Sequence, residues 1–95
     1  MHAYESMFII SSQQSEEQAD SLIAKFEELI TSNGGELVKT DRMGRRRLAY
    51  QIGDDLEGYY TVLYFNATGA TVAELERVFK ITDGVIRYLI IRKDD

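Results

Sequence analysis

The sequence predicts an α+β fold in which four strands and two helices follow the order β-α-β-β-α-β, within one domain over residues 1–95. Short runs rich in β-forming residues alternate with segments whose apolar residues recur every three or four positions. The chain has no proline, so its seven glycines provide the turn and break signals between these segments. Two split β-α-β units in this order form a ferredoxin-like sandwich, a four-stranded antiparallel sheet with both helices on one face.

The first strand is expected over residues 3–11, "AYESMFIIS", a short apolar run rich in β-formers. A helix follows, because six apolar residues then fall at helical spacing on one stripe. Those residues are Ala19, Leu22, Ile23, Phe26, Leu29 and Ile30. Ser15 fits the N-cap with Gln18 at the capping-box position. Asn33-Gly34-Gly35 should end the helix, because glycine adopts the left-handed C-cap conformation at little cost.

The second half of the chain repeats this organisation. We expect a strand over residues 36–52 with a bend near Gly44, a turn over 53–58, a strand over 59–67, a helix over 71–81 and a last strand over 84–93. Thr71 and Glu74 fit a second capping box. Right-handed crossovers place the first and third strands in the centre of the sheet. The predicted core between the helices and the sheet contains Phe26, Leu29, Leu75 and Phe79.

The sheet face away from the helices should alternate to polar residues, but the strands are apolar on both parities. In the third strand Tyr60, Val62 and Tyr64 lie on one parity, with Leu63 and Phe65 on the other. One interpretation is the ordinary apolar surface that small proteins carry. The other is a face that binds a partner.

The composition argues against an enzyme. The chain has no cysteine and a single histidine, His2, which we expect on a frayed terminus. A thiolate metal site, a histidine cluster or a serine–histidine–aspartate triad therefore has almost nothing to be built from, and no cofactor or metal is expected. The paired carboxylates, including Asp54 and Asp55, are interpreted as solvated charges on helix surfaces or in turns. No stretch resembles a signal peptide or a transmembrane span, so we expect a soluble intracellular protein without a membrane partner.

One short segment concentrates positive charge. Residues 41–47 hold four arginines and one aspartate, a local charge of +3 in a chain of net charge −5. Charged side chains on an edge strand discourage pairing with other chains. Arginine also binds phosphate and carboxylate in a bidentate manner, which would steer this edge toward nucleic acid. Arg87, Arg92 and Lys93, on the opposite edge strand, could extend such a contact.

Two alternatives remain open at this point. One is an RNA-recognition module that binds single strands without a partner, since it shares this topology. "EGYYTVLY", residues 57–64, matches the third-strand signature of such modules at four positions, but Thr61 stands where a base-stacking aromatic belongs. The mismatches also include Glu57 and Tyr60. The other alternative is a regulatory or small-ligand domain that homo-oligomerises through its open sheet face.

Five segments resemble the bacterial small-subunit ribosomal protein six family, in order and over essentially the whole chain. They are Tyr4-Glu5, Gly34-Gly35, "GRRRLAYQI" at 44–52, "EGYY" at 57–60 and "RYLIIR" at 87–92. The resemblance implies a ferredoxin-like, non-enzymatic constituent of the small ribosomal subunit in the cytoplasm. It further implies binding to the central domain of small-subunit rRNA together with small-subunit ribosomal protein eighteen, with no small-molecule substrate.

By position, the resemblance implies that the partner docks along the second strand and that Arg87 contacts phosphate. The expected partner-binding residues are Asp41, Arg42, Arg46, Arg47, Leu48 and Tyr50. The expected RNA-binding residues are Arg45, Arg87, Arg92, Lys93 and His2. His2 stands where the family usually has a basic residue after the initiator methionine. Gln51 replaces the proline of the family's L-A-Y-P-I motif, which restores one backbone donor on that strand.

Overall fold

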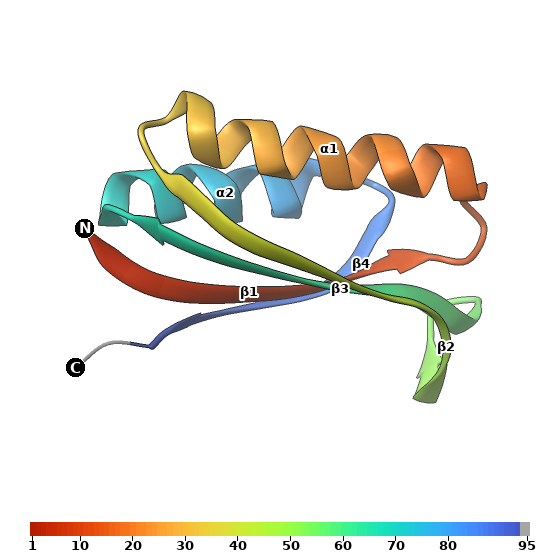
Figure 1. Cartoon of the computed structure of the whole chain (residues 1–95). Coiled ribbons are helices and arrows are strands. Elements are labelled where there is room, and N and C mark those ends of the chain that lie inside the picture. The colour runs from red at the N-terminus through yellow and green to blue at the C-terminus, as the bar shows by residue number, and fades with distance from the viewer. Residues whose placement is uncertain (94–95) are drawn as a thin grey trace.

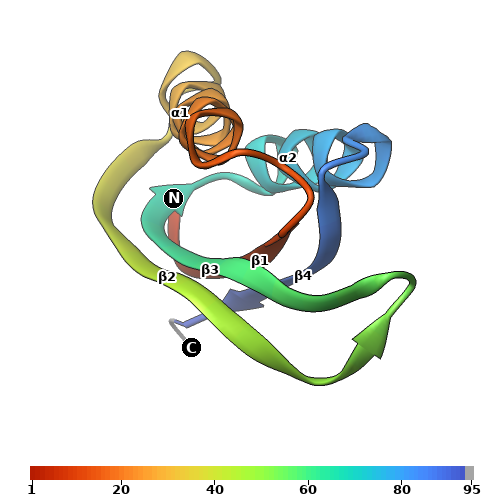
Figure 2. The same ribbon diagram turned by 90° about the vertical axis from the view of Figure 1, so that its right-hand side faces the viewer.

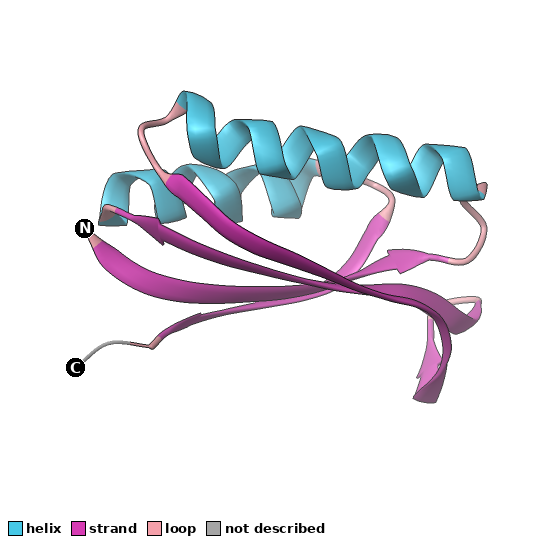
Figure 3. Cartoon of the chain, viewed as in Figure 1, coloured by secondary structure: helices cyan, strands magenta, loops and turns pink. Residues whose placement is uncertain are grey.

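A computed structural model describes residues 1–93 of the chain as one two-layer sandwich (Figure 1). The element order is β-α-β-β-α-β, as predicted. The elements are β1 His2–Ser11, α1 Glu16–Ser32, β2 Glu36–Ile52, β3 Asp55–Ala67, α2 Gly69–Ile81 and β4 Val85–Arg92. Figure 3 shows both helices lying on the same face of the strands. No helix within residues 1–93 has both the length and the apolarity to cross a membrane.

The four strands form one antiparallel sheet in the order β2-β3-β1-β4. The central strands are therefore β1 and β3, as the crossover argument predicted. β1 also begins one residue earlier than expected, because His2 pairs with Ala67 on β3. His2 is half-buried there, so the prediction of a frayed position is wrong.

The core lies between the helices and one face of the sheet, around three phenylalanines. Phe8 of β1, Phe26 of α1 and Phe79 of α2 are buried, with ring centres 4.8–5.2 Å apart. Leu75 is buried beside them and Leu29 is half-buried at the margin. The helical spacing thus identified the correct faces of both helices.

The sequence signals at the ends of α1 are confirmed. The Ser15 hydroxyl accepts from the Gln18 backbone N–H at 3.1 Å, and the Ser15 N–H donates to the Gln18 side chain at 2.8 Å. At the other end Gly34 has φ +86°, a left-handed conformation that glycine adopts without a Cβ penalty.

The predicted start of the second helix is wrong. α2 begins at Gly69 with Thr68 as the N-cap residue, so Thr71 lies inside the first turn. Thr71 is buried, and its hydroxyl donates to the Asn33 carbonyl at the end of α1, at 2.9 Å. Glu74 instead pairs with Arg77, whose hydrogen bond lowers the pKa of the Glu74 carboxyl. Thr71 therefore ties the two helices together rather than capping one of them.

The predicted turn over residues 53–58 is also wrong, because β3 begins at Asp55. Only Gly53 and Asp54 separate β2 from β3, and Gly53 supplies the turn with φ +57°. The β2–β3 hairpin is therefore long enough to leave the sheet. Figure 2 shows it passing on the side away from the helices, toward β4.

Candidate partner and nucleic-acid interface

The arginine segment lies on β2, an edge strand of the sheet. The strand bends where predicted: Gly44 has φ +78°, and the ladder with β3 shifts register between Arg42 and Gly44. A bulge of this kind increases the local twist and redirects the side chains that follow. The four arginines consequently do not share one environment.

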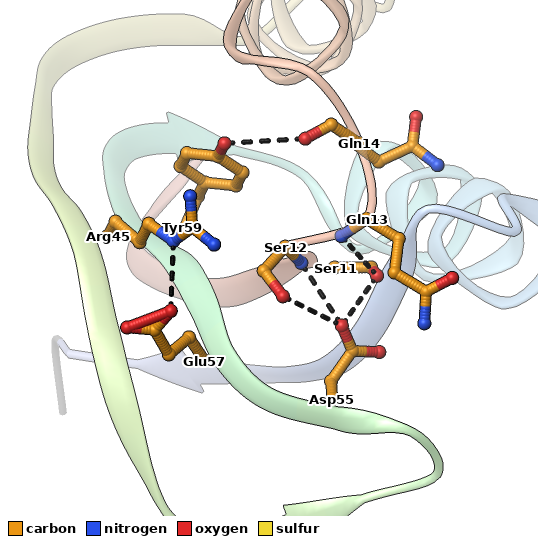
Figure 4. Close-up of polar contacts among 8 residues, drawn as sticks. All are labelled: Ser11, Ser12, Gln13, Gln14, Arg45, Asp55, Glu57 and Tyr59. Carbon is orange, nitrogen blue, oxygen red and sulfur yellow. Dashed lines mark hydrogen bonds and ion pairs between the residues drawn. The ribbon is translucent and has the colours of Figure 1, made fainter.

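Two of the arginines are engaged with the body of the protein. Arg42 forms an ion pair with Asp20 on α1. Arg45 donates to Glu57 at 3.2 Å, and its guanidinium carbon lies 6.0 Å from the centre of the Tyr59 ring (Figure 4). Both therefore point toward the helix layer in this conformation.

Arg46 and Arg47 are exposed and differ from the other two. Arg46 makes a long contact of 3.5 Å with the Met43 carbonyl. Neither residue forms an ion pair within the part of the chain that the structure describes. Asp41, half-buried, lies opposite Val62 on the neighbouring strand. The edge of β2 thus presents two uncompensated guanidinium groups beside the sheet.

The sheet face away from the helices, called the open face below, is apolar. Its residues are Met7 and Ile9 of β1, Tyr60, Val62 and Tyr64 of β3, and Leu89 and Ile91 of β4. Leu89 and Ile91 are 50% and 42% exposed. The sequence prediction of two apolar sheet faces is confirmed, and the second of them is only partly covered by the chain itself.

That partial cover comes from residues 48–52 at the end of β2, called the strap below. The ladder with β3 is interrupted there, since Arg47 pairs with Glu57 and the next pair is Ile52 with Asp55. The strap and the open face enclose a pocket of about 290 Å³, lined by Leu48, Tyr50, Met7, Ile9, Arg87 and Leu89 among others. Leu48 is only 8% exposed, so in the free chain it packs inward rather than toward a partner.

The strap brings together residues predicted for two different sites. Arg87 on β4 donates a hydrogen bond to the Tyr50 hydroxyl, and its guanidinium carbon lies 5.7 Å from the centre of the Tyr50 ring. Tyr50 is an expected partner contact and Arg87 an expected phosphate contact. The two predicted sites would therefore adjoin at this pair.

The remaining expected RNA-binding residues form a separate group at the far end of β4. Arg92 Nη2 lies 2.8 Å from His2 Nδ1, and the Lys93 ammonium lies 3.8 Å from the Glu5 carboxylate. Five positions along β4 separate Arg92 from Arg87, which is roughly 16 Å at ~3.3 Å per residue. An RNA that touched both points would have to follow the length of this edge strand.

Sequence reasoning missed the residue that anchors the hairpin. Asp55 was expected to be a solvated turn carboxylate but is 6% exposed. Its Oδ1 accepts from the Ser11 hydroxyl at 2.8 Å, the Ser12 hydroxyl at 3.1 Å and the Ser12 N–H at 3.2 Å (Figure 4). Tyr59 adds a bond from its hydroxyl to the Gln14 carbonyl at 3.3 Å. These contacts fasten the turn end of the hairpin to the loop between β1 and α1.

The arrangement of β3 argues against an RNA-recognition module. Thr61 is 1% exposed, and its pleat neighbours Leu63 and Phe65 are in the core. Tyr59 packs against the same core. An aromatic side chain at position 61 would therefore point into the helix layer, where it cannot stack on a base. Within residues 1–93 no group of histidine, cysteine, aspartate or glutamate could hold a metal ion.

Comparison with known proteins agrees with this geometry. The family model "Ribosomal protein S6" matches residues 3–92. The small ribosomal subunit protein bS6 of Thermoanaerobacter pseudethanolicus is 52% identical over 95 residues, which is 100% of both chains. That of Caldanaerobacter subterraneus is 48% identical over the same full lengths.

The crystal structure of 30S ribosomal protein S6 from Thermotoga maritima superposes with a TM-score of 0.93 at 38% sequence identity, covering 97% of this chain and 87% of that chain. These relatives are structural proteins of the small ribosomal subunit, so the expectation of a non-enzymatic role is confirmed. The chain belongs to the ribosomal protein S6 family.

Proposed function

We propose that this chain, at work on the cytoplasmic ribosome, binds the central domain of small-subunit rRNA together with small-subunit ribosomal protein eighteen. The observation that carries the proposal is the edge of β2, where the exposed Arg46 and Arg47 form no ion pair within residues 1–93 and directly precede the strap over the apolar open face. The rest of the chain is acidic, with a net charge of −5 overall. An acidic body repels RNA, so binding by the chain alone is weak and a second protein must supply part of the affinity.

The partner is assigned to β2 and the adjoining open face. An edge strand offers unpaired backbone groups that a second chain can bond. Arg46 and Arg47 add forked donors for carboxylates of that chain, and Asp41 offers an acceptor. Tyr50 supplies a rigid aromatic contact of the kind that dominates interface energies. Leu48 is buried under this surface and supports it. Arg42 can contact the partner only if its ion pair with Asp20 breaks and a carboxylate of the partner takes the place of Asp20.

The RNA contacts are assigned to the β4 side. Arg87 is exposed at one end of the strand, while His2, Arg92 and Lys93 gather at the other. Arg45 lies apart from these residues, on β2 at the opposite edge of the sheet, and contributes a second contact if phosphate displaces Glu57, its present partner. Each phosphate neutralised by such a side chain releases counterions, so the affinity should fall as salt rises.

The test measures binding of a labelled central-domain rRNA fragment by filter retention at several salt concentrations. We expect weak binding by the chain alone and at least tenfold tighter binding when the partner protein is present. Arg87→Ala should reduce the slope of log affinity against log salt by about one. Arg77→Ala, an exposed arginine on α2 in the opposite layer, is the matched control and should change neither quantity.

Two outcomes would contradict the proposal. Tight binding of short single strands by the chain alone would favour an independent RNA-binding module. A stable homodimer that binds no RNA, with or without the partner, would favour an oligomeric domain instead.

A further inference from the structure

In the free chain the Tyr50 and Arg87 side chains contact each other, although the proposed function assigns them to different ligands. We propose that this contact is an intramolecular lock that couples the partner site on β2 to the phosphate site on β4. The inference rests on the proposed function for the identity of the two ligands. It rests on the structure for the lock itself, because Arg87 donates to the Tyr50 hydroxyl and lies against its ring.

The strap that carries Tyr50 has few ladder pairs with β3. Four residues, 48–51, lie opposite the single residue Leu56 between the last two ladder pairs of the hairpin. Their position therefore depends on contacts with the open face more than on backbone bonds to β3. The contacts that hold the strap there include Leu48, which is buried in the pocket, Tyr50, which bonds Arg87, and Ile52, which lines the pocket and pairs with Asp55. Beside the strap, Asp55 fixes the turn end of the hairpin to the loop between β1 and α1, so motion of residues 48–51 leaves the hairpin attached.

The lock competes directly with phosphate binding. A phosphate recognised by arginine takes two donors of the guanidinium fork. In the free chain one of those nitrogens already donates to Tyr50, and the tyrosine ring lies near the guanidinium group. Because both side chains are exposed, the contact is weak, and we expect its removal to raise the affinity of Arg87 for an anion about two- to fivefold.

The same contact links the two ligands. A partner protein that draws Tyr50 into its own interface frees Arg87 for phosphate. A phosphate on Arg87 frees Tyr50 for the partner. By thermodynamic reciprocity each ligand raises the affinity for the other by the same factor.

This coupling has a signature that lost packing would not produce. Tyr50→Ala should weaken binding of the partner protein, because it removes an aromatic contact. It should also tighten binding of the rRNA fragment by the chain alone, about two- to fivefold, because it removes the competitor for Arg87. In an Arg87→Ala background the second effect should vanish. Leu56→Ala, which removes a 58% exposed apolar side chain from the same hairpin, is the matched control and should leave RNA affinity unchanged.

The experiment measures rRNA-fragment affinity of the chain alone for the wild type, both single variants, the double variant and the control, at one salt concentration. Urea midpoints confirm that each variant folds. If Tyr50→Ala is too unstable, Tyr50→Phe removes only the hydroxyl and should act in the same direction with a smaller increase. Unchanged or weaker affinity in the Tyr50 variants would overturn the lock, as would an increase that persists without Arg87.

A second probe separates failure of the lock from failure of the proposed function. Inorganic pyrophosphate is titrated while the Arg87 side-chain resonances are followed by NMR. If Tyr50→Ala tightens pyrophosphate binding but no variant binds rRNA with the partner, the lock stands and the proposed function fails. If rRNA and the partner assemble on the wild type but Tyr50→Ala tightens binding of neither the rRNA fragment nor pyrophosphate, the lock fails and the proposed function stands.

Discussion

Asp55 provides the sharpest test of how the hairpin is held. If it were a solvated carboxylate in a turn, Asp55→Ala would change the free energy of unfolding by no more than about 0.5 kcal/mol. The structure instead places its Oδ1 against three donors on Ser11 and Ser12. The two interpretations therefore predict stability losses of different size for the same substitution.

The magnitude follows from the surroundings of each donor. A hydrogen bond to a charged group is worth about 1.5–3 kcal/mol when its loss strands a buried partner. Ser11 is 7% exposed and would be stranded, whereas Ser12 is half-buried and can turn to water. We therefore expect Asp55→Ala to cost about 2–4 kcal/mol, a large part of the 5–15 kcal/mol typical of a domain. Asp55→Asn keeps an acceptor without the charge and should lose about half as much.

Urea unfolding at pH 7, followed by circular dichroism, measures this loss. Asp54→Ala is the matched control, because Asp54 is the adjacent carboxylate and is exposed in the turn. It should change stability by no more than about 0.5 kcal/mol. Equal effects of the two alanine variants would refute the reasoning, since they would mean that Asp55 is as well solvated as its neighbour.

Three further predictions concern the core and the edge. Phe26→Ala should cost about 3–5 kcal/mol in urea melts, because Phe26 is buried between two other phenylalanines, and a loss under about 1 kcal/mol would contradict that packing. Ser6→Ala should be neutral or stabilising by up to about 1 kcal/mol, because the buried Ser6 hydroxyl has no hydrogen-bond partner within residues 1–93; a clear destabilisation would show that it is satisfied by water. Changing Arg46 and Arg47 together to serine should leave the urea midpoint unchanged. It should weaken assembly with the partner and increase light scattering by the free chain, and normal assembly without scattering would exclude both roles for these arginines.

The interface residues were predicted unevenly. The sequence pointed to Arg46, Arg47 and the apolar open face, because charge and residue type are visible without coordinates. It could not separate these two arginines from Arg42 and Arg45, because the acidic partners of the latter, Asp20 on α1 and Glu57 on β3, lie on other elements. Nor could it show that Tyr50 contacts Arg87, since 37 positions separate them along the chain. Their roles in binding remain predictions.

The sequence by itself determined the order of the elements, the inward faces of both helices, the caps of α1 and the bend at Gly44. Each of these depends on local periodicity, on one capping side chain or on the freedom of glycine at positive φ. Only the tertiary structure decided that Asp55 is buried, that α2 begins before Thr71 and that the strap lies over the open face. Those features depend on groups that meet across 44 positions for Asp55 and Ser11, and 38 for Thr71 and Asn33. Such meetings are set by the twist of the sheet and the path of the hairpin, which no local pattern encodes.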